Sequence, residues 1–189
     1  CTYGIAYTLP IDQLPVSSGY GEPLAKRAKM KDGVSVINAM TTDSRFVPDL
    51  DSVGDGVGLT ILIATREGQV MRLPYEAFRT PSTKAGRKFC RLGKTDQVIY
   101  VELVRDAETM FIASKKARVL HFRIDEVPVL GGAGKGVRGL KLESGDEVLG
   151  VVQLSRPSDA LRVRNDNDSV LSFGQTKYQV NSRGGRGVK

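Results

Sequence analysis

The sequence predicts an all-β fold, built as a propeller-like array of four-stranded blades of about 50 residues each. A tetrapeptide pattern recurs at 70–73, 119–122 and 170–173, at spacings of 49 and then 51 residues. Short segments of apolar and β-branched residues, bounded by turn residues, dominate the chain, and no stretch has the periodicity of an amphipathic helix. Repetition at such a fixed period is typical of an array of similar supersecondary units.

Five segments rich in β-branched or apolar residues are predicted strands: 60–65, 68–73, 97–103, 109–113 and 118–122. Three polar segments in the same register are predicted hairpin tips: 66–68, 115–116 and 165–168. Glycine or asparagine at such a tip provides a positive φ angle at little energetic cost. At most one helical turn is expected, close to Phe78.

The repeat divides a single β domain, 1–189, into four blades at about 1–50, 57–105, 107–154 and 159–189. Each blade is expected to hold a hairpin, a short connector, a segment rich in glycine and basic residues, and two more strands. The first blade lacks its opening strand, and the last blade stops before its second half. Residues 41–56 and 155–159 are expected linkers. Because the chain opens on Cys1 in mid-pattern, we interpret it as a piece of a longer protein.

The net charge of +7 and the pI of about 9.5 favour a polyanionic partner. The basic residues gather in the glycine-rich segments and keep the register of the repeat, since 134–138 and 185–189 are 51 residues apart. Glycine lets a phosphate approach the backbone closely, and lysine or arginine then neutralises the phosphate charge. Repeated in every blade, these segments predict a basic stripe around the rim that suits a long polyanion.

The candidate phosphate contacts are the basic residues of these segments: Lys26, Arg27, Lys29, Lys84, Arg87, Lys88, Arg91, Lys135, Arg138, Lys141, Arg183, Arg186 and Lys189. In an alternative interpretation, the glycines only permit a bulge or a crossover between blades, and the charges are solvated. A disordered Arg-Gly-Gly tail at 183–187 that binds RNA is another alternative, although the register of this segment matches 134–138.

No pattern predicts an active site or a metal centre. His121 is the only histidine and lies within a predicted strand, so a surface or structural role is expected for it. Cys1 and Cys90 have neither the number nor the spacing of a disulfide framework or a metal site, which favours a reducing cytosol. No apolar run approaches the roughly 18–20 residues of a membrane span. No signal peptide is predicted from these residues, and 131–136 lack the spacing of a phosphate-binding P-loop.

Three segments resemble the C-terminal domain of the A subunit of bacterial type IIA topoisomerases, the family of DNA gyrase and topoisomerase IV. Residues 63–74 look like its ATxxGxVxRxP hairpin, with the sequence Ile-Ala-Thr-Arg-Glu-Gly-Gln-Val-Met-Arg-Leu-Pro. Residues 134–148 are similar to its GVRGIxLxxGDEV segment, and 183–189 to its RGGKGVK segment. The similarity extends over essentially the whole chain.

The resemblance implies a β-pinwheel, a propeller-like disc whose blades exchange strands with their neighbours. It also implies that the rim binds duplex DNA without sequence specificity and bends or wraps it, so that a segment is presented for strand passage. The fragment is then not itself an enzyme and holds no cofactor, because the catalytic tyrosine, Mg²⁺ and ATP sites of the parent topoisomerase lie in other domains. The implied partners are duplex DNA and an A-subunit homodimer bound to the ATPase B subunit, in the bacterial cytoplasm at the nucleoid, with no membrane.

The sequence departs from the gyrase pattern at one motif. Gyrases carry a box resembling Gln-Arg-Arg-Gly-Gly-Lys-Gly, associated with full wrapping, and residues 181–187 keep only its last five positions conservatively. The box also falls in the last blade and not in the first. This departure favours a topoisomerase IV-like or divergent gyrase subunit. Two other functions stay open: a propeller-like platform for an acidic protein partner, and an RNA-binding array of small barrels.

Overall fold

The computed structural model describes residues 1–47 and 58–189, and these residues form short strands joined by turns. The strands are β1 Ile5–Ala6, β2 Thr60–Thr65, β3 Gln69–Pro74, β4 Arg87–Lys88, β5 Val98–Val104, β6 Thr109–Ser114, β7 Val119–Arg123, β8 Val137–Arg138, β9 Val148–Leu154, β10 Ala160–Arg164 and β11 Val170–Gly174. Helical structure in the described ranges is limited to 3-10 turns at Ile11–Gln13, Leu24–Lys26, Tyr75–Phe78 and Ile124–Glu126. The all-β prediction is confirmed. Within these ranges, no helix has the length and apolar character needed to cross a bilayer.

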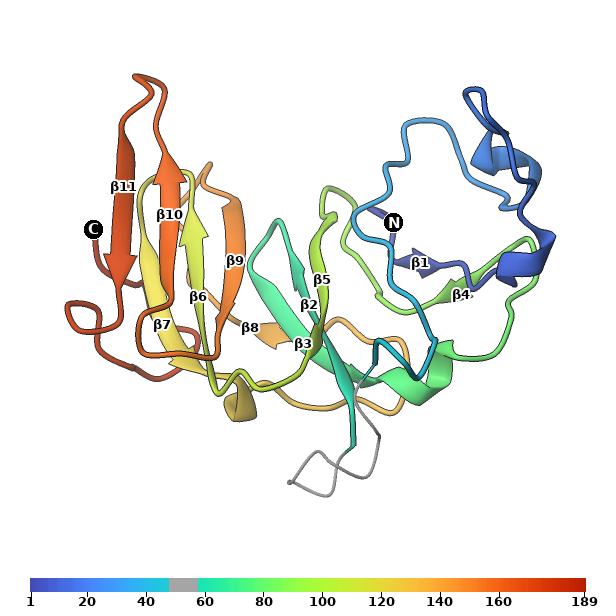
Figure 1. The fold of residues 1–189 in the computed structure, drawn as a ribbon. Coiled ribbons are helices and arrows are strands. Elements are labelled where there is room, and N and C mark those ends of the chain that lie inside the picture. The colour runs from blue at the N-terminus through green and yellow to red at the C-terminus, as the bar shows by residue number, and fades with distance from the viewer. Residues whose placement is uncertain (48–57) are drawn as a thin grey trace.

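The strands form four sheets that stand side by side in chain order (Figure 1). The β1–β4 sheet lies near the N-terminus at one side of the view, and the β10–β11 hairpin lies near the C-terminus at the other. The central sheet has the order β5-β2-β3-β8, and the next has the order β7-β6-β9. In both of these sheets the neighbouring strands run antiparallel.

Three of the four sheets pair with a segment from the unit that follows them in the chain, and in two of these sheets the segment is a strand. β8 lies beyond the β6–β7 hairpin in sequence, yet it pairs with Gln69 and Val70 of β3. β4 pairs with β1 in the same way, and Val188 bridges to Val119 of β7. This exchange is the strand arrangement that the resemblance implied, and it ties neighbouring units together through main-chain hydrogen bonds.

The five predicted strands all form, and each predicted boundary agrees with β2, β3, β5, β6 or β7 to within one residue. One part of the expected unit is wrong. The glycine-rich basic segment is not followed by two more strands, because it forms one short strand itself (β4 or β8) and only one long strand (β5 or β9) follows. Of the expected linker 41–56, residues 48–56 lie outside the described residues.

The hairpin tips share one backbone feature in all four units. Equivalent residues there adopt positive φ angles: Gly4 (70°), Gly68 (85°), Ala117 (60°) and Asp168 (60°). A tight antiparallel turn needs such an angle, which glycine accepts most easily. Ala117 and Asp168 adopt it without glycine, and so the third and fourth tips lack the glycine that marks the second.

Three apolar clusters hold the row together, each between neighbouring sheets. Leu62 and Ala64 of β2 pack into the cluster shared with β6 and β7, whereas Ile61 and Ile63 pack into the cluster on the opposite face. Both faces of β2 are therefore buried. A strand buried on both faces is expected to be apolar at successive positions and not alternating, which explains the run 61–64.

Candidate nucleic-acid interface

The glycines of the basic segments are required by the strand exchange. Gly136 has a φ of 75°, and a Cβ atom there would lie 2.5 Å from the main-chain oxygen of Val70. Gly187 has a φ of 69°, and a Cβ atom would lie 2.6 Å from the oxygen of Val119. Any side chain at either position would clash with the strand that receives the exchanged segment. The crossover interpretation thus accounts for these two glycines, and their recurrence does not by itself indicate a phosphate site.

The basic segments nevertheless join into one continuous run. The same main-chain hydrogen bond links each segment to the next: Lys29 N–H to Lys84 O (2.6 Å), Arg91 N–H to Gly134 O (2.8 Å), and Lys141 N–H to Gly185 O (2.8 Å). We call the resulting surface, residues 26–29, 84–91, 134–141 and 183–189, the basic edge. The thirteen candidate residues belong to these four segments, which the main-chain hydrogen bonds hold next to one another along the row of sheets.

The hairpin tips pack directly against this edge. The N–H of Phe89 donates to the main-chain oxygen of Gly4 (2.8 Å), and the N–H of Gly139 donates to that of Gly68 (2.7 Å). Tip and basic segment are thus held in the same relative position in successive units. The far ends of the strands, such as the end of β5 at Val104, lie away from the basic edge, since β5 enters the tip region at Val98 beside Thr65.

Most of the candidate side chains are exposed, but three are half-buried and each of these has a partner. The half-buried group is Arg27, Arg87 and Arg183; the exposed group is Lys26, Lys29, Lys84, Lys88, Arg91, Lys135, Arg138, Lys141, Arg186 and Lys189.

Arg183 serves the fold. Its Nε donates to the main-chain oxygen of Glu126 (3.0 Å), and its Nη1 donates to that of Arg138 (2.6 Å). Its own N–H donates to a carboxylate oxygen of Glu126 at 2.9 Å. The guanidinium therefore fastens the last basic segment to the unit before it and is directed toward protein oxygens.

Three more candidates have protein partners. The Arg87 guanidinium donates to the main-chain oxygen of Ala77 and to Thr80 Oγ1, the latter at 3.1 Å. Lys26 Nζ and Arg27 Nη2 lie 3.3 and 3.2 Å from the carboxylate of Glu22. Hydrogen bonds from Lys26 and then from Arg27 lower the pKa of Glu22 below its usual value. Together with Arg183, these candidates are the weakest of the thirteen as DNA contacts.

The remaining nine candidates are exposed basic residues: Lys29, Lys84, Lys88, Arg91, Lys135, Arg138, Lys141, Arg186 and Lys189. None of them forms an ion pair with an acid in the described ranges 1–47 and 58–189. Two carboxylates that follow the third basic segment form their ion pairs with other cations, although Lys189 also acts on Glu143 at longer range. Glu143 pairs with Arg118 at 2.8 Å, which lowers the pKa of this carboxyl, and Glu147 pairs with Lys115 and with Arg66.

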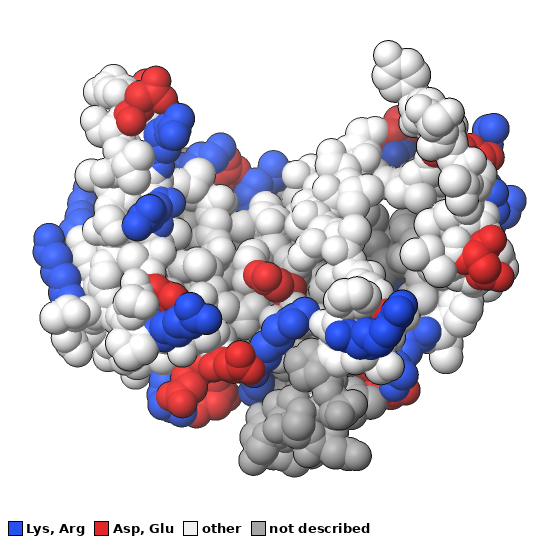
Figure 2. Space-filling model, in the orientation of Figure 1, with Lys and Arg blue, Asp and Glu red and all other residues white. Residues whose placement is uncertain are grey.

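The sequence predicted Lys115 and Lys116 only as a hairpin tip, but their side chains bind residues that follow the third basic segment in the chain. Lys116 Nζ donates to the main-chain oxygen of Ser144 at 2.5 Å, and Lys115 pairs with Glu147. The sequence signal that could have added them to the candidate basic residues is a lysine pair at a hairpin tip in register with the repeat. Figure 2 shows that one face of the molecule carries Lys and Arg mixed with Asp and Glu, so positive charge is not uniform over the whole surface.

His121 is buried, with an exposed fraction of 3%, and both of its ring nitrogens have partners. Nδ1 lies 2.6 Å from the main-chain oxygen of Tyr178, and Nε2 lies 2.9 Å from Thr109 Oγ1. The structural role expected for this histidine is thus the one it has. Among the described residues, no three His, Cys, Asp or Glu side chains gather as metal ligands would.

Comparison with known proteins agrees with the architecture. The C-terminal domain of DNA topoisomerase IV superposes with a TM-score of 0.86 at 21% identity, over 99% of this chain and 55% of that chain. The E. coli ParC C-terminal domain superposes with a TM-score of 0.77 at 20% identity, over 99% of this chain and 73% of that one. At these identities the two structures establish the fold.

Curated relatives match along most of the chain. The A subunit of DNA gyrase from Staphylococcus epidermidis is 28% identical over 180 residues, which are 90% of this chain and 19% of that protein. The A subunit of DNA gyrase from Klebsiella oxytoca is 28% identical over 131 residues, which are 69% of this chain and 15% of that protein. The chain therefore spans less than a fifth of the length of these relatives.

A family model matches the units one by one. The model described as the DNA gyrase C-terminal domain, beta-propeller, matches residues 4–43, 60–105 and 108–155, which together make up more than half of the chain. These ranges contain the first three hairpins or their remnants and the exchanged strands β4 and β8. The resemblance noted in the sequence is confirmed, and the chain belongs to the DNA gyrase C-terminal domain family.

Proposed function

We propose that this chain binds duplex DNA along the basic edge, through the phosphate backbone, and bends the duplex as it follows the row of sheets. The observation that carries the proposal is the main-chain hydrogen bond that recurs three times and aligns the four basic segments. The aligned segments carry nine exposed cations that form no ion pair with an acid among the described residues. A series of like charges on a rigid support matches the charge spacing of a polyanion better than that of a small ligand.

Backbone contacts are expected in place of base readout. The described residues present no α-helix that could enter a major groove, and lysine and arginine on a sheet edge suit phosphate oxygens. Sequence preference should then come from the ease with which the DNA bends. Single-stranded nucleic acid is a weaker match, because it is usually held by exposed aromatic side chains. The only aromatic residue on the basic edge, Phe89, is 4% exposed.

In the parent protein, the bent segment would be presented to the cleavage core of a type IIA topoisomerase for strand passage. The partners in this proposal are an A-subunit dimer and the ATPase B subunit, in the bacterial cytoplasm, with Mg²⁺ and ATP used by other domains. Support comes from the family membership and from the relatives, which are named as the A subunit of DNA gyrase. The alternative is that the basic edge receives an acidic protein.

Salt dependence provides the first test. If six to ten phosphates are neutralised, affinity for a duplex should fall on the order of 10³–10⁵-fold between 50 and 200 mM salt. Fluorescence anisotropy with labelled duplexes of different sequence measures both this slope and the sequence preference. A flat salt response, or tighter binding to single strands, would contradict the proposal.

Charge reversal provides the second test, with a matched control. Arg138→Glu combined with Arg186→Glu reverses two exposed charges in different basic segments and should weaken binding to every duplex alike, with a shallower salt slope. Arg105→Glu combined with Arg162→Glu changes net charge equally at exposed positions outside the basic edge. An equal loss of duplex affinity in the two double variants would mean that binding depends only on net charge, and that the basic edge is not the DNA-binding site.

Ligation of nicked circles distinguishes DNA bending from handed wrapping. If DNA follows the edge with a handed path, circles sealed in the presence of the chain should show a shifted linking number. An unshifted linking number together with tight duplex binding would indicate that the chain bends DNA without wrapping it in a handed path. Weak duplex binding together with tight binding to an acidic protein would favour the alternative.

A further inference from the structure

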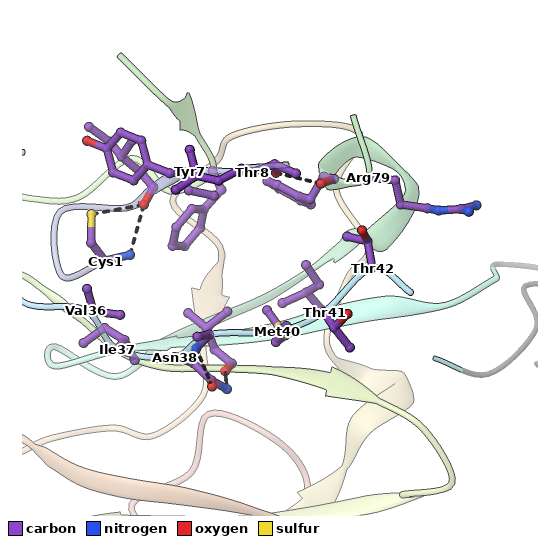
Figure 3. A pocket seen from close by; sticks show the side chains of 18 of the residues that line it. Cys1, Tyr7, Thr8, Val36, Ile37, Asn38, Met40, Thr41, Thr42 and Arg79 are labelled. Atoms are coloured by element: carbon purple, nitrogen blue, oxygen red, sulfur yellow. Dashed lines mark hydrogen bonds between the residues drawn. The ribbon is translucent and has the colours of Figure 1, made fainter. Parts of the chain in front are cut away.

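In the second, third and fourth units, a short loop precedes the basic segment, and both of its ends are bonded to the unit before it. In the second unit, Ser82 N–H donates to Thr8 O (2.9 Å) at one end of the loop, and Lys84 O accepts from Lys29 N–H (2.6 Å) at the other. Thr8 itself lies on the wall of the cavity drawn in Figure 3. Thr83, the residue between the two ends, is exposed.

The loop of the third unit shows that the residues between such ends protrude. Leu130 N–H donates to Arg72 O (2.9 Å), and Gly134 O accepts from Arg91 N–H (2.8 Å). Between these ends, residues 131–132 are exposed, and a Cβ atom at either position would meet nothing within 4 Å, although the second unit lies alongside. We call the residues between the two ends of each loop its crest: 83 in the second unit, 131–133 in the third and 182–184 in the fourth.

The first unit has a corresponding crest, residues 18–21, beside its basic segment. As in the second and third units, the loop ends seven residues before the cation whose N–H bonds to the next unit, and here these residues are Glu22 and Lys29. The Glu22 carboxylate lies 3.3 Å from Lys26 Nζ and 3.2 Å from Arg27 Nη2, which ties the crest to the first basic segment. Figure 1 shows this part of the chain, in blue, extending away from the sheets.

Tyr20 lies on this crest and is completely exposed, with a relative exposure of 113%. It stands between Gly19 and Gly21, and Gly19 N–H donates to Ser17 Oγ at 3.0 Å. The other crests carry small side chains, except for Arg183, whose guanidinium donates to protein oxygens. The ring of Tyr20 buries almost none of its surface in the fold, so it is available to whatever the first basic segment binds.

We propose that Tyr20 is a non-electrostatic DNA contact, whose ring enters the minor groove of a duplex held on the first basic segment while exposed cations such as Lys29 bind the flanking phosphates. The minor groove is about 6 Å wide, so an aromatic ring that enters edge-on touches both walls, whereas the major groove, about 12 Å wide, would leave one face of the ring in water. The hydroxyl at the end of the ring can bond to the acceptors on the groove floor. Tyr20 thereby fixes which face of the duplex meets the basic edge. The inference rests on the proposed duplex binding.

The test compares the salt dependence of duplex binding in four forms of the full chain: the unchanged chain, Tyr20→Ala, Tyr20→Phe and Tyr3→Ala. Tyr3→Ala is the matched control, because Tyr3 is an exposed tyrosine of the first unit that lies beside the tip residue Gly4 and not on the crest. Tyr20→Ala should weaken binding by about fivefold or more at every salt concentration, with an unchanged salt slope, because the ring neutralises no phosphate. Tyr20→Phe should keep most of the affinity and Tyr3→Ala all of it, and equal midpoints of thermal unfolding should show that all four forms are folded.

A second measurement identifies the groove. On an A·T-rich duplex saturated with netropsin, a small ligand that fills the minor groove, the unchanged chain and Tyr20→Ala should bind equally. A difference between the two that persists with netropsin would overturn the inference, because the ring would then lie outside the minor groove.

Equal affinity of the unchanged chain and Tyr20→Ala for the free duplex would also overturn the inference, and it would leave the proposed duplex binding intact. A loss confined to single strands would mean that Tyr20 stacks on unpaired bases and does not enter a groove. An unchanged chain that binds no duplex would overturn the proposed function itself, and the inference with it.

Discussion

His121 is joined to Tyr178 across the boundary between the third and fourth units. Because a main-chain oxygen can only accept, the imidazole donates its Nδ1–H to Tyr178 O over 2.6 Å, and Thr109 Oγ1 lies 2.9 Å from Nε2. The same position of the recurring tetrapeptide in the second unit is Arg72, whose Nε donates to Val127 O at 2.9 Å. One place in the repeat thus supplies a side chain that binds the backbone of the following unit.

Replacing His121 should loosen the last unit. His121→Ala leaves the Tyr178 oxygen without this donor and opens a cavity, so we expect a loss of about 2–4 kcal/mol in the free energy of unfolding. Urea denaturation measures the loss, and hydrogen exchange should show it first in β10 and β11. Ser172→Ala changes the exposed residue at the equivalent place in the fourth unit and should have little effect. A neutral His121→Ala would show that the contact does not join the units.

Gly136 should tolerate no side chain. Gly136→Ala places a Cβ atom about 2.5 Å from the Val70 oxygen at a φ of 75°, so β8 must move away from β3. We expect a loss of roughly 2–4 kcal/mol in stability. Gly132→Ala is the matched control in the same loop, where a Cβ atom meets nothing within 4 Å. Thermal unfolding of both variants tests the strand exchange, and similar midpoints would contradict it.

Arg183 and Arg186 should separate stability from DNA binding. Arg183→Ala removes two donors to main-chain oxygens and should lower the free energy of unfolding by about 1–3 kcal/mol. Arg186→Ala removes an exposed charge and should change stability by less than about 0.5 kcal/mol. It should, however, weaken duplex binding and reduce the salt slope by about 1. Denaturation and anisotropy on the same samples measure both effects. A loss of stability in Arg186→Ala, with unchanged stability in Arg183→Ala, would contradict the roles given to the two residues.

Cys90 should be unreactive in the folded chain. Burial raises the pKa of its thiol to about 12, with a smaller effect from Asp96, so almost none of it is thiolate at neutral pH. A free cysteine has a pKa near 8.5 and reacts increasingly as the pH rises through that value. A thiol reagent at about pH 8 should therefore label Cys90 only after unfolding, whereas the half-buried Cys1 should be labelled in the folded chain. Rapid labelling of both thiols in the native chain would show that Cys90 is accessible.

The hairpins could be predicted from the sequence, but the pairing partners of the short strands β4 and β8 could not. β2 and β6 have both faces buried, so their composition alone identifies them. β4 and β8 have two residues each and pair with strands far away in the sequence, which local pattern does not specify. The glycines at 136 and 187 suggested phosphate binding and a crossover equally well, and only the approach to Val70 and Val119 decides for the crossover.

The candidate site shows the same limit. The register of the repeat placed all thirteen basic residues on one edge, because equivalent positions in a repeat occupy equivalent places. It did not distinguish Arg183 from Arg186, since both are arginines beside glycine in one segment. The difference depends on the main-chain oxygens of Glu126 and Arg138, which come from the preceding unit.

The strand exchange between neighbouring units affects how the chain folds during synthesis. As the ribosome adds residues in order, β3 must wait for Val137 and Arg138, which emerge only after the whole β6–β7 hairpin. Until then its outer edge is open to pairing with other nascent chains, a known source of aggregation. Folding should therefore proceed from the amino end, and the open edge of each sheet should be covered only when the next unit has been synthesised.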